Sequence, residues 1–219
     1  MSMASIAQQY IEGLKNAYLK AGKNGAEEWE HFVSVKHGVS AEDEMKLLQQ
    51  YPEIPASLVE LLEFADGTYW REYGDEEIAF YFLGSDVDEG GYPYYLYSAE
   101  QLIEDNDMNY GDNFADLFYW YKEEQAEGGD DPYGLFVDPR IRQDGSRCEW
   151  LCFSDCMNNG GTSSLFIDYT PAESGRKGQI IRFLHDPDRL DVIADSFDDY
   201  LKMVIDKNFA FVNPMFFED

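Results

Sequence analysis

Apolar side chains recur at helical spacing along the first third of the chain. One set falls every fourth residue, which places it on a single helical stripe; its members are Ile6, Tyr10, Leu14 and Tyr18. Gly22 and Gly25 are expected to close this helix. A second short helix is expected around Trp29, Phe32 and Val33, ending at His37-Gly38.

Two further helices carry start signals. Ser40 followed by Asp43 resembles a capping box, and Met45, Leu47 and Leu48 would form the apolar side of the helix that it opens. Pro55 suits a first helical position. The apolar residues after it keep helical spacing up to Asp66-Gly67, which stops the helix; they are Leu58, Leu61, Leu62 and Ala65.

The pattern then changes to short aromatic or β-branched runs bounded by glycine, serine and acidic residues, as is typical of strands. The expected strands are Ile78–Leu83, Tyr94–Tyr97, Trp150–Phe153, Leu165–Tyr169, Gln179–Leu184 and a short one at Val192-Ile193. Helices are expected after Ser98, over 113–126 and after Ser196. Helices first, hairpin-spaced strands next and a closing helix predict an α+β single-domain sandwich, with a predominantly antiparallel or mixed sheet flanked by helices.

Charge narrows the classes of partner. The 219 residues include 44 Asp and Glu against 16 Lys and Arg, a net charge of −28. A surface this negative disfavours nucleic acid and anionic membranes, which are bound chiefly by basic clusters. The sequence has no apolar run of 18 residues and no basic, apolar leader at its start. Three cysteines are too few, and odd in number, for a disulfide scaffold, which fits a reducing compartment. We therefore expect a cytoplasmic protein.

Two patterns invite a metal site, and neither fits one. Cys148, Cys152 and Cys156 lie four residues apart, without the paired knuckles of zinc sites; if Trp150–Phe153 is a strand, Cys156 lies beyond its end. The second pattern has the ligand spacing of a calcium loop, at Asp105, Asp107, Asn109 and Asp116. Tyr110 stands where the turn needs glycine, which favours a solvated loop over calcium binding.

Catalytic motifs are missing too. His31, His37 and His185 have no nucleophile-bearing motif beside them, and no nucleophile elbow, P-loop or dinucleotide fingerprint occurs. We therefore expect neither an enzyme nor a cofactor. The acids gather in clusters such as Asp75-Glu76-Glu77. Solubility accounts for part of this charge, and the sharper interpretation is a surface that steers a cationic protein partner.

The later part of the chain carries a series of strand and turn motifs at Cys148 to Asp155, Asn158 to Gly161, Ser164 to Pro171, the Gly175 to Ile181 turn and strand, and Ala194 to Leu201. In these strings the chain resembles the SUKH superfamily. Within these strings, the positions that match the family are Trp150, Gly160-Gly161, Asp168 with Pro171, Gly175 to Gln179, and Ser196-Phe197. A weaker block from Gly38 to Gly67 matches the earlier half, with Asp66-Gly67 where the family commonly has Asn-Gly. Glycines, caps and core aromatics fix a fold more firmly than a function.

The resemblance covers most of residues 30–205 and implies one SUKH-like domain over 1–219. Residues 1–37 would form its N-terminal helical segment. Residues 103–147 lack a family anchor, and we interpret them as an insertion. For function, the resemblance implies a bacterial immunity protein that neutralises a cognate, basic, nuclease-type toxin. The alternative is an adaptor or regulatory binding module with no toxin partner.

Aromatic residues interleaved with acids are the candidate anchors for that partner. The first group is Tyr69, Trp70 and Tyr73 beside Asp75, Glu76 and Glu77, and the second is Tyr92 and Tyr94 beside Asp86, Asp88 and Glu89. Exposed aromatic and charged side chains of this kind dominate the binding energy of many interfaces. Core packing is the alternative for any one aromatic of the two groups.

Overall fold

The computed structural model describes residues 4–104, 136–143, 148–156, 163–185 and 188–216. Its α-helices are α1 (Ile6–Lys20), α2 (Lys23–Val35), α3 (Ala41–Gln50), α4 (Ala56–Phe64), α5 (Ala99–Glu104) and α7 (Phe197–Asp206), with 3-10 turns η1 (Val87–Gly90) and η3 (Pro214–Phe216). Its strands are β1 (Arg71–Tyr73), β2 (Glu76–Ile78), β3 (Leu83–Gly84), β4 (Pro93–Leu96), β5 (Phe136–Val137), β6 (Trp150–Cys156), β7 (Ser163–Asp168), β8 (Gln179–Leu184) and β9 (Arg189–Ala194).

The strands form a mixed sheet of seven and a separate hairpin. The large sheet has the order β3-β4-β6-β7-β8-β9-β5, and β1 pairs only with β2. All neighbours in the large sheet run antiparallel except β5, which lies parallel to β9 at the edge. The predicted α+β fold with a mixed sheet flanked by helices is confirmed. The described end of the 103–147 segment supplies the edge strand β5.

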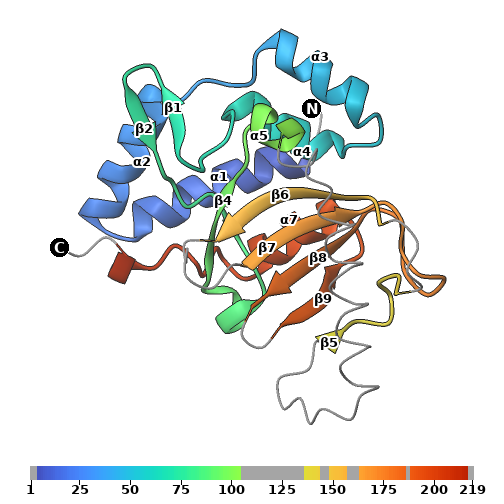
Figure 1. Cartoon of the computed structure of the whole chain (residues 1–219). Helices are drawn as coiled ribbons and strands as arrows, with labels where there is room; N and C mark the ends of the chain where they lie inside the picture. Colours follow the sequence, from blue (N-terminus) through green and yellow to red (C-terminus); the bar gives the residue numbers. More distant parts are fainter. Residues whose placement is uncertain (1–3, 105–135, 144–147, 157–162, 186–187, 217–219) are drawn as a thin grey trace.

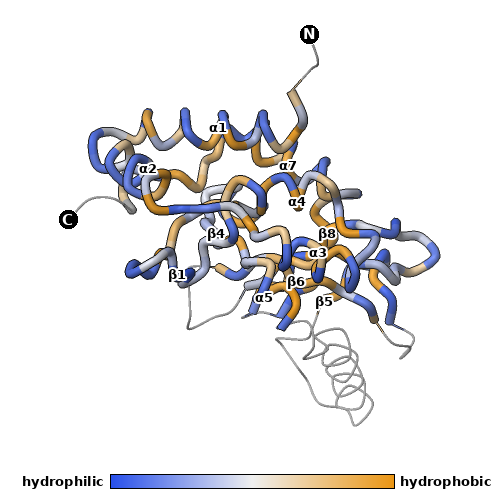
Figure 2. The backbone as a smooth tube through the Cα atoms, turned by 90° about the horizontal axis from the view of Figure 1, so that it is seen from above, coloured by the Kyte–Doolittle hydropathy of each residue, from blue (hydrophilic) through white to orange (hydrophobic). Residues whose placement is uncertain are grey.

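Helices cover one face of the sheet (Figure 1). Phe153 of β6 packs edge-on against Phe197 and Tyr200 of α7, and α1 packs across α4 and α7. The tube of α1 is orange on the side toward these helices and blue on the other side (Figure 2). The predicted apolar stripe of α1 is confirmed, because Tyr10, Leu14 and Tyr18 are fully buried.

Tyrosine hydroxyls from the helices tie the aromatic segment 79–84 into the core. Tyr10 Oη donates to the Phe82 carbonyl at 2.8 Å, Tyr18 Oη to that of Tyr81 at 2.7 Å and Tyr200 Oη to that of Gly84 at 2.6 Å. These bonds satisfy carbonyl groups that would otherwise need a neighbouring strand. The predicted single strand Ile78–Leu83 is therefore wrong in part, since only its two ends belong to β2 and β3.

The predicted helix starts are confirmed at their caps. The Ser40 and Ser196 hydroxyls accept hydrogen bonds from the amides of Asp43 and Asp199, both at 3.1 Å. Ser98 and Gln101 bond reciprocally at the start of α5. Such caps need only residues three positions apart, so they can be read from the sequence.

Some predicted apolar faces are wrong. Val33, Met45 and Leu48 are exposed, Met45 to 65 %, because α2 and α3 each bury a narrower stripe than the pattern predicts. Gly25 lies inside α2 and does not close α1. Cys156, expected beyond the end of its strand, is the buried last residue of β6. The helix expected at 113–126 lies outside the described residues.

Candidate partner-binding surface

The first group of predicted anchors lies on the β1–β2 hairpin. Tyr73 and Glu76 are opposite each other across the two-residue turn Gly74-Asp75. Gly74 has φ +67°, as the tight turns of two-residue hairpins require. The hairpin pairs with no other described strand, and it packs beside α2 (Figure 1). Four of its eight residues are acidic and one, Arg71, is basic.

One face of the hairpin is fixed to the body of the protein. Tyr73 is buried; its hydroxyl donates to the Gly67 carbonyl at 2.7 Å, and its ring meets His37 edge-on. Glu76 lies 2.7 Å from His31 of α2, and Ile78 is buried. The expectation that Tyr73 is an exposed anchor is therefore wrong, because strand alternation turns it inward with Ile78.

Asp66 connects the hairpin to α5, and the sequence interpretation gave it only the role of a helix stop. Its carboxylate is 2 % exposed and accepts from the Arg71 guanidinium at 2.8 Å and the Ala99 amide at 2.9 Å. Arg71 also reaches Glu100 at 3.4 Å. The sequence feature that could have indicated this role is the pair Asp66-Gly67. Gly67 has φ +87°, and a Cβ there would lie 2.5 Å from the Ser98 amide nitrogen.

The outer face of the hairpin carries two opposed carboxylates. Glu72 and Glu77 are direct partners in the strand register, and both are exposed. Side chains at such positions have Cβ atoms about 4.5–5.5 Å apart, and like charges there are destabilising. Within the described residues neither glutamate forms an ion pair; the pairs of this hairpin belong to Arg71 and Glu76. The carboxylates of Glu72 and Glu77 are therefore available to bind a cation of a partner.

Trp70 adds a large exposed aromatic at the start of the hairpin. Its side chain is 48 % exposed and its backbone has φ +49°, a region that bulky residues rarely occupy. Tyr69, by contrast, is half-buried, and its ring packs against Tyr95 and Tyr97. Trp70, Glu72, Asp75 and Glu77 are all exposed, and we call these four residues the hairpin surface.

The second predicted group differs from the first because one of its acids is already paired with a buried arginine. Asp86 lies 3.2 Å from the buried Arg182 guanidinium, which also binds Asp191 at 2.5 Å. Asp88 and Glu89 are exposed. Tyr94 is fully buried and its hydroxyl bonds to Ser163 at 2.5 Å. The expectation that Tyr94 is exposed is wrong, and Tyr92 is half-buried against its ring.

The structure does not bring the two groups together. Thr68, just before the hairpin, bonds to Leu96 at the C-terminal end of β4. The turn η1, which carries Asp88 and Glu89, connects β3 to β4 at the opposite end, next to Pro93. The groups are thus separated by the length of β4, and we treat the hairpin surface alone as the candidate site.

The other candidate chemistry is resolved in part. Cys148, Cys152 and Cys156 are buried and form no disulfide bond, and no group of three or more His, Cys, Asp or Glu in the described ranges could hold a metal ion. The calcium pattern at 105–116 lies outside these ranges. His185 lies 2.5 Å from Asp188. No helix among the described residues is long and apolar enough to cross a membrane.

The later sequence motif forms a buried polar cluster where β6, β7 and β8 meet. The Asp168 carboxylate is fully buried and accepts from the Thr170 amide and the Gln179 side chain, both at 2.9 Å. Gln179 also donates to the Arg140 carbonyl at 3.1 Å. Desolvation raises the pKa of Asp168, although these hydrogen bonds oppose the shift. The described motif positions thus hold strand ends and turns together.

Most of the chain matches a known protein family. The model of the SMI1 / KNR4 family (SUKH-1) matches residues 40–203, about three quarters of the chain. The match includes the hairpin and the Asp168 cluster. No curated protein matches the sequence.

Proposed function

The chain belongs to the SMI1 / KNR4 family (SUKH-1), and from this premise we propose that it is an immunity protein that binds and neutralises a cognate toxin. The family includes toxin immunity proteins. We propose further that the toxin domain is basic and of nuclease type, and that the immunity protein acts in the cytoplasm by occlusion, with no catalysis of its own.

The observation that carries the proposal is the hairpin surface. It combines an exposed tryptophan with two opposed glutamates that form no ion pair with any described residue. Tryptophan and charged residues are frequent energetic anchors of interfaces, whereas other contacts mainly exclude water. An arginine of the toxin placed between Glu72 and Glu77 would neutralise the repulsion between the two carboxylates. Because this repulsion destabilises only the free protein, its removal would favour the complex.

The whole-chain charge supports the same partner. A net charge of −28 attracts a basic domain over long distances and raises its association rate. A standard interface buries about 1,600 Å², far more than the hairpin alone offers, so neighbouring surface must contribute. Nucleases hold phosphate groups in basic grooves, and an acidic surface competes for such a groove.

Co-expression with the toxin encoded beside the gene tests the proposal. We expect the intact protein to restore growth and to co-purify with the toxin domain. Trp70→Gly should lose both effects while keeping the melting temperature or raising it, because glycine relieves the positive φ at this position. The matched control is Glu149→Lys with Glu173→Lys, two exposed acids outside the hairpin.

Two outcomes would contradict the proposal. The immunity function fails if the intact protein neither protects nor forms a complex. Recovery of housekeeping proteins, with no toxin, would favour the adaptor alternative. If protection survives in Trp70→Gly and is lost in the Glu149/Glu173 control, the function stands and the hairpin surface is not the site.

A further inference from the structure

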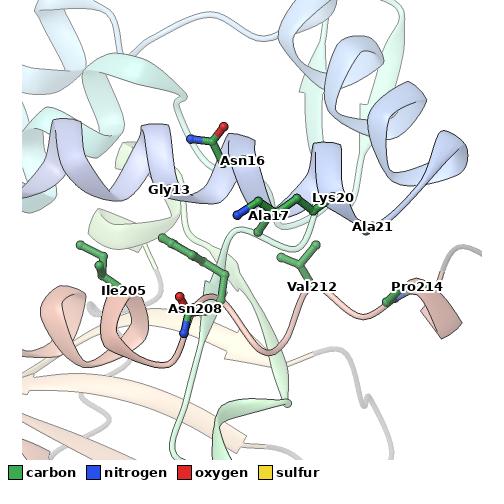
Figure 3. A pocket seen from close by; sticks show the side chains of 10 residues that line it. Gly13, Asn16, Ala17, Lys20, Ala21, Ile205, Asn208, Val212 and Pro214 are labelled. Atoms are coloured by element: carbon green, nitrogen blue, oxygen red, sulfur yellow. The ribbon is translucent and has the colours of Figure 1, made fainter.

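A groove separates α1 from the segment that follows α7, remote from the hairpin surface in the sequence and unused by the proposed function. Its volume is about 420 Å³, within the range of small-ligand sites. Ala17 of α1 and Ala21, the C-cap residue of that helix, line it on one side (Figure 3). Phe209, Val212 and Pro214 of the C-terminal segment line it on the other side.

Small side chains and a strained turn create the groove. Gly13 lets the Phe209 ring approach α1, since a Cβ at residue 13 would lie 2.4 Å from the ring. Asn208 and Phe209 have φ +52° and +53°, and two consecutive left-handed residues redirect the chain after α7. Ala17 lies one turn beyond Gly13 in α1 and Ala21 caps the end of the helix, so small side chains leave the space beside Phe209 open.

The charge of the lining departs from that of the chain. One residue in five of this protein is acidic, so ten average residues would include two acids. None of the ten lining residues is acidic, and the one charged member is Lys20. Its side chain extends along α1 with the amine toward Ala17 (Figure 3).

The Lys20 amine is also uncommitted among the described residues. Its neighbours on either side form ion pairs, Lys15 with Glu12 at 4.0 Å and Lys23 with Glu27 at 3.3 Å, whereas Lys20 has none. Asn16 and Asn208 add amide groups at the rim. An apolar floor with one available cation complements a ligand that has an apolar body and one anionic head.

We infer that this groove binds an amphiphilic monocarboxylate, with its alkyl or aryl body on Ala17, Ala21 and Val212 and its carboxylate on Lys20. The inference does not depend on a toxin. The probe for testing it is decanoate, and decanol is the neutral analogue with the same chain length. Titration calorimetry of the full chain measures both.

We expect saturable 1:1 binding of decanoate below its micelle concentration, and at least tenfold weaker binding of decanol. Lys20→Glu should weaken decanoate at least tenfold, while the matched control Lys15→Gln on the same helix leaves it unchanged. Ala17→Phe should fill the groove and abolish binding of both probes, with an unchanged circular dichroism spectrum as evidence of folding.

Three results would overturn the inference. The first is the absence of saturable decanoate binding to the intact protein. The second is equal affinity for decanol and decanoate, which removes the role of the cation. The third is unchanged decanoate affinity in Lys20→Glu, a surface variant that needs no repacking and therefore remains informative even if Ala17→Phe fails to fold.

Discussion

Reversing one charge of the Glu72–Glu77 pair should stabilise the protein and weaken the proposed binding of a basic partner. In Glu77→Lys the new ammonium lies directly opposite Glu72 in the strand register, so a repulsion becomes an attraction. Cross-strand charge pairs contribute about 0.2–1 kcal/mol each, and exposure limits the gain. We expect the free energy of unfolding to rise by about 0.5–1 kcal/mol, which corresponds to about 1–4 °C in Tm.

The same substitution presents a cation to the proposed basic partner. We expect toxin affinity to fall by about 2 kcal/mol or more, roughly thirtyfold, as for charge pairs whose partner is lost at an interface. Urea unfolding measures the first effect and calorimetric titration with the toxin domain measures the second. Opposite signs for stability and affinity are the specific expectation.

A charge-swap series separates the pair from the general effect of net charge. Glu72→Lys alone should stabilise as Glu77→Lys does, because it creates the same pair in reverse. The double variant places two lysines opposite each other, so its stability should return toward that of the intact protein. If the two gains simply add, relief of the −28 net charge explains them, and the reasoning from the cross-strand pair is refuted.

Three other predictions test the fold and the electrostatics. Gly67→Ala should lower the free energy of unfolding by about 2–4 kcal/mol, because the alanine has a strained φ of +87° and its Cβ also meets the Ser98 backbone. Gly74→Ala has a strained φ of +67° but open space around it, so it should cost about 1 kcal/mol. Equal losses for the two variants in urea melts would contradict the role of the Ser98 contact. Burial raises the pKa of Asp168, so above the ordinary pKa of 3.8 the unfolded chain releases this proton more readily than the folded protein does. The free energy of unfolding of the intact protein should therefore fall relative to that of Asp168→Asn as pH rises above 3.8. A pH-independent difference between the two proteins would contradict the raised pKa. The association rate with the toxin should fall markedly from low to physiological salt in stopped-flow measurements, and a flat response would remove long-range steering from the mechanism.

Local signals made most elements predictable, whereas packing between distant segments did not. The caps at Ser40, Ser98 and Ser196 join residues three positions apart, and the Gln179–Leu184 strand has the bounds expected from its apolar run. The hairpin escaped prediction because glutamates dominate its short strands and are poor strand formers. Only Tyr73 and Ile78 carry its inward pattern, too few positions to establish a period of two.

The candidate site was predictable in its residue types and not in their orientation. Tyr73 and Tyr94 lie in aromatic stretches close to acidic residues, as Trp70 does, and yet both are buried. Their hydroxyl groups find partners at Gly67 and Ser163, which lets a tyrosine enter the core at little cost. Tryptophan at residue 70 is held outside by a backbone φ of +49°, which interrupts strand alternation.

The distribution of ion pairs explains how a −28 chain keeps a specific acidic surface. Arginines hold the acids that lie inside or at strand ends: Arg71 binds Asp66, Arg140 binds Asp138, and Arg182 binds Asp191. The Arg140 guanidinium lowers the pKa of Asp138, which therefore stays ionised. These bases stabilise the fold and are not available to neutralise Glu72 and Glu77. Solubility alone would not favour two opposed carboxylates, because charge elsewhere disperses the protein equally well without repulsion across a hairpin. A cationic partner gives that arrangement a use, since binding removes a repulsion that the free protein carries.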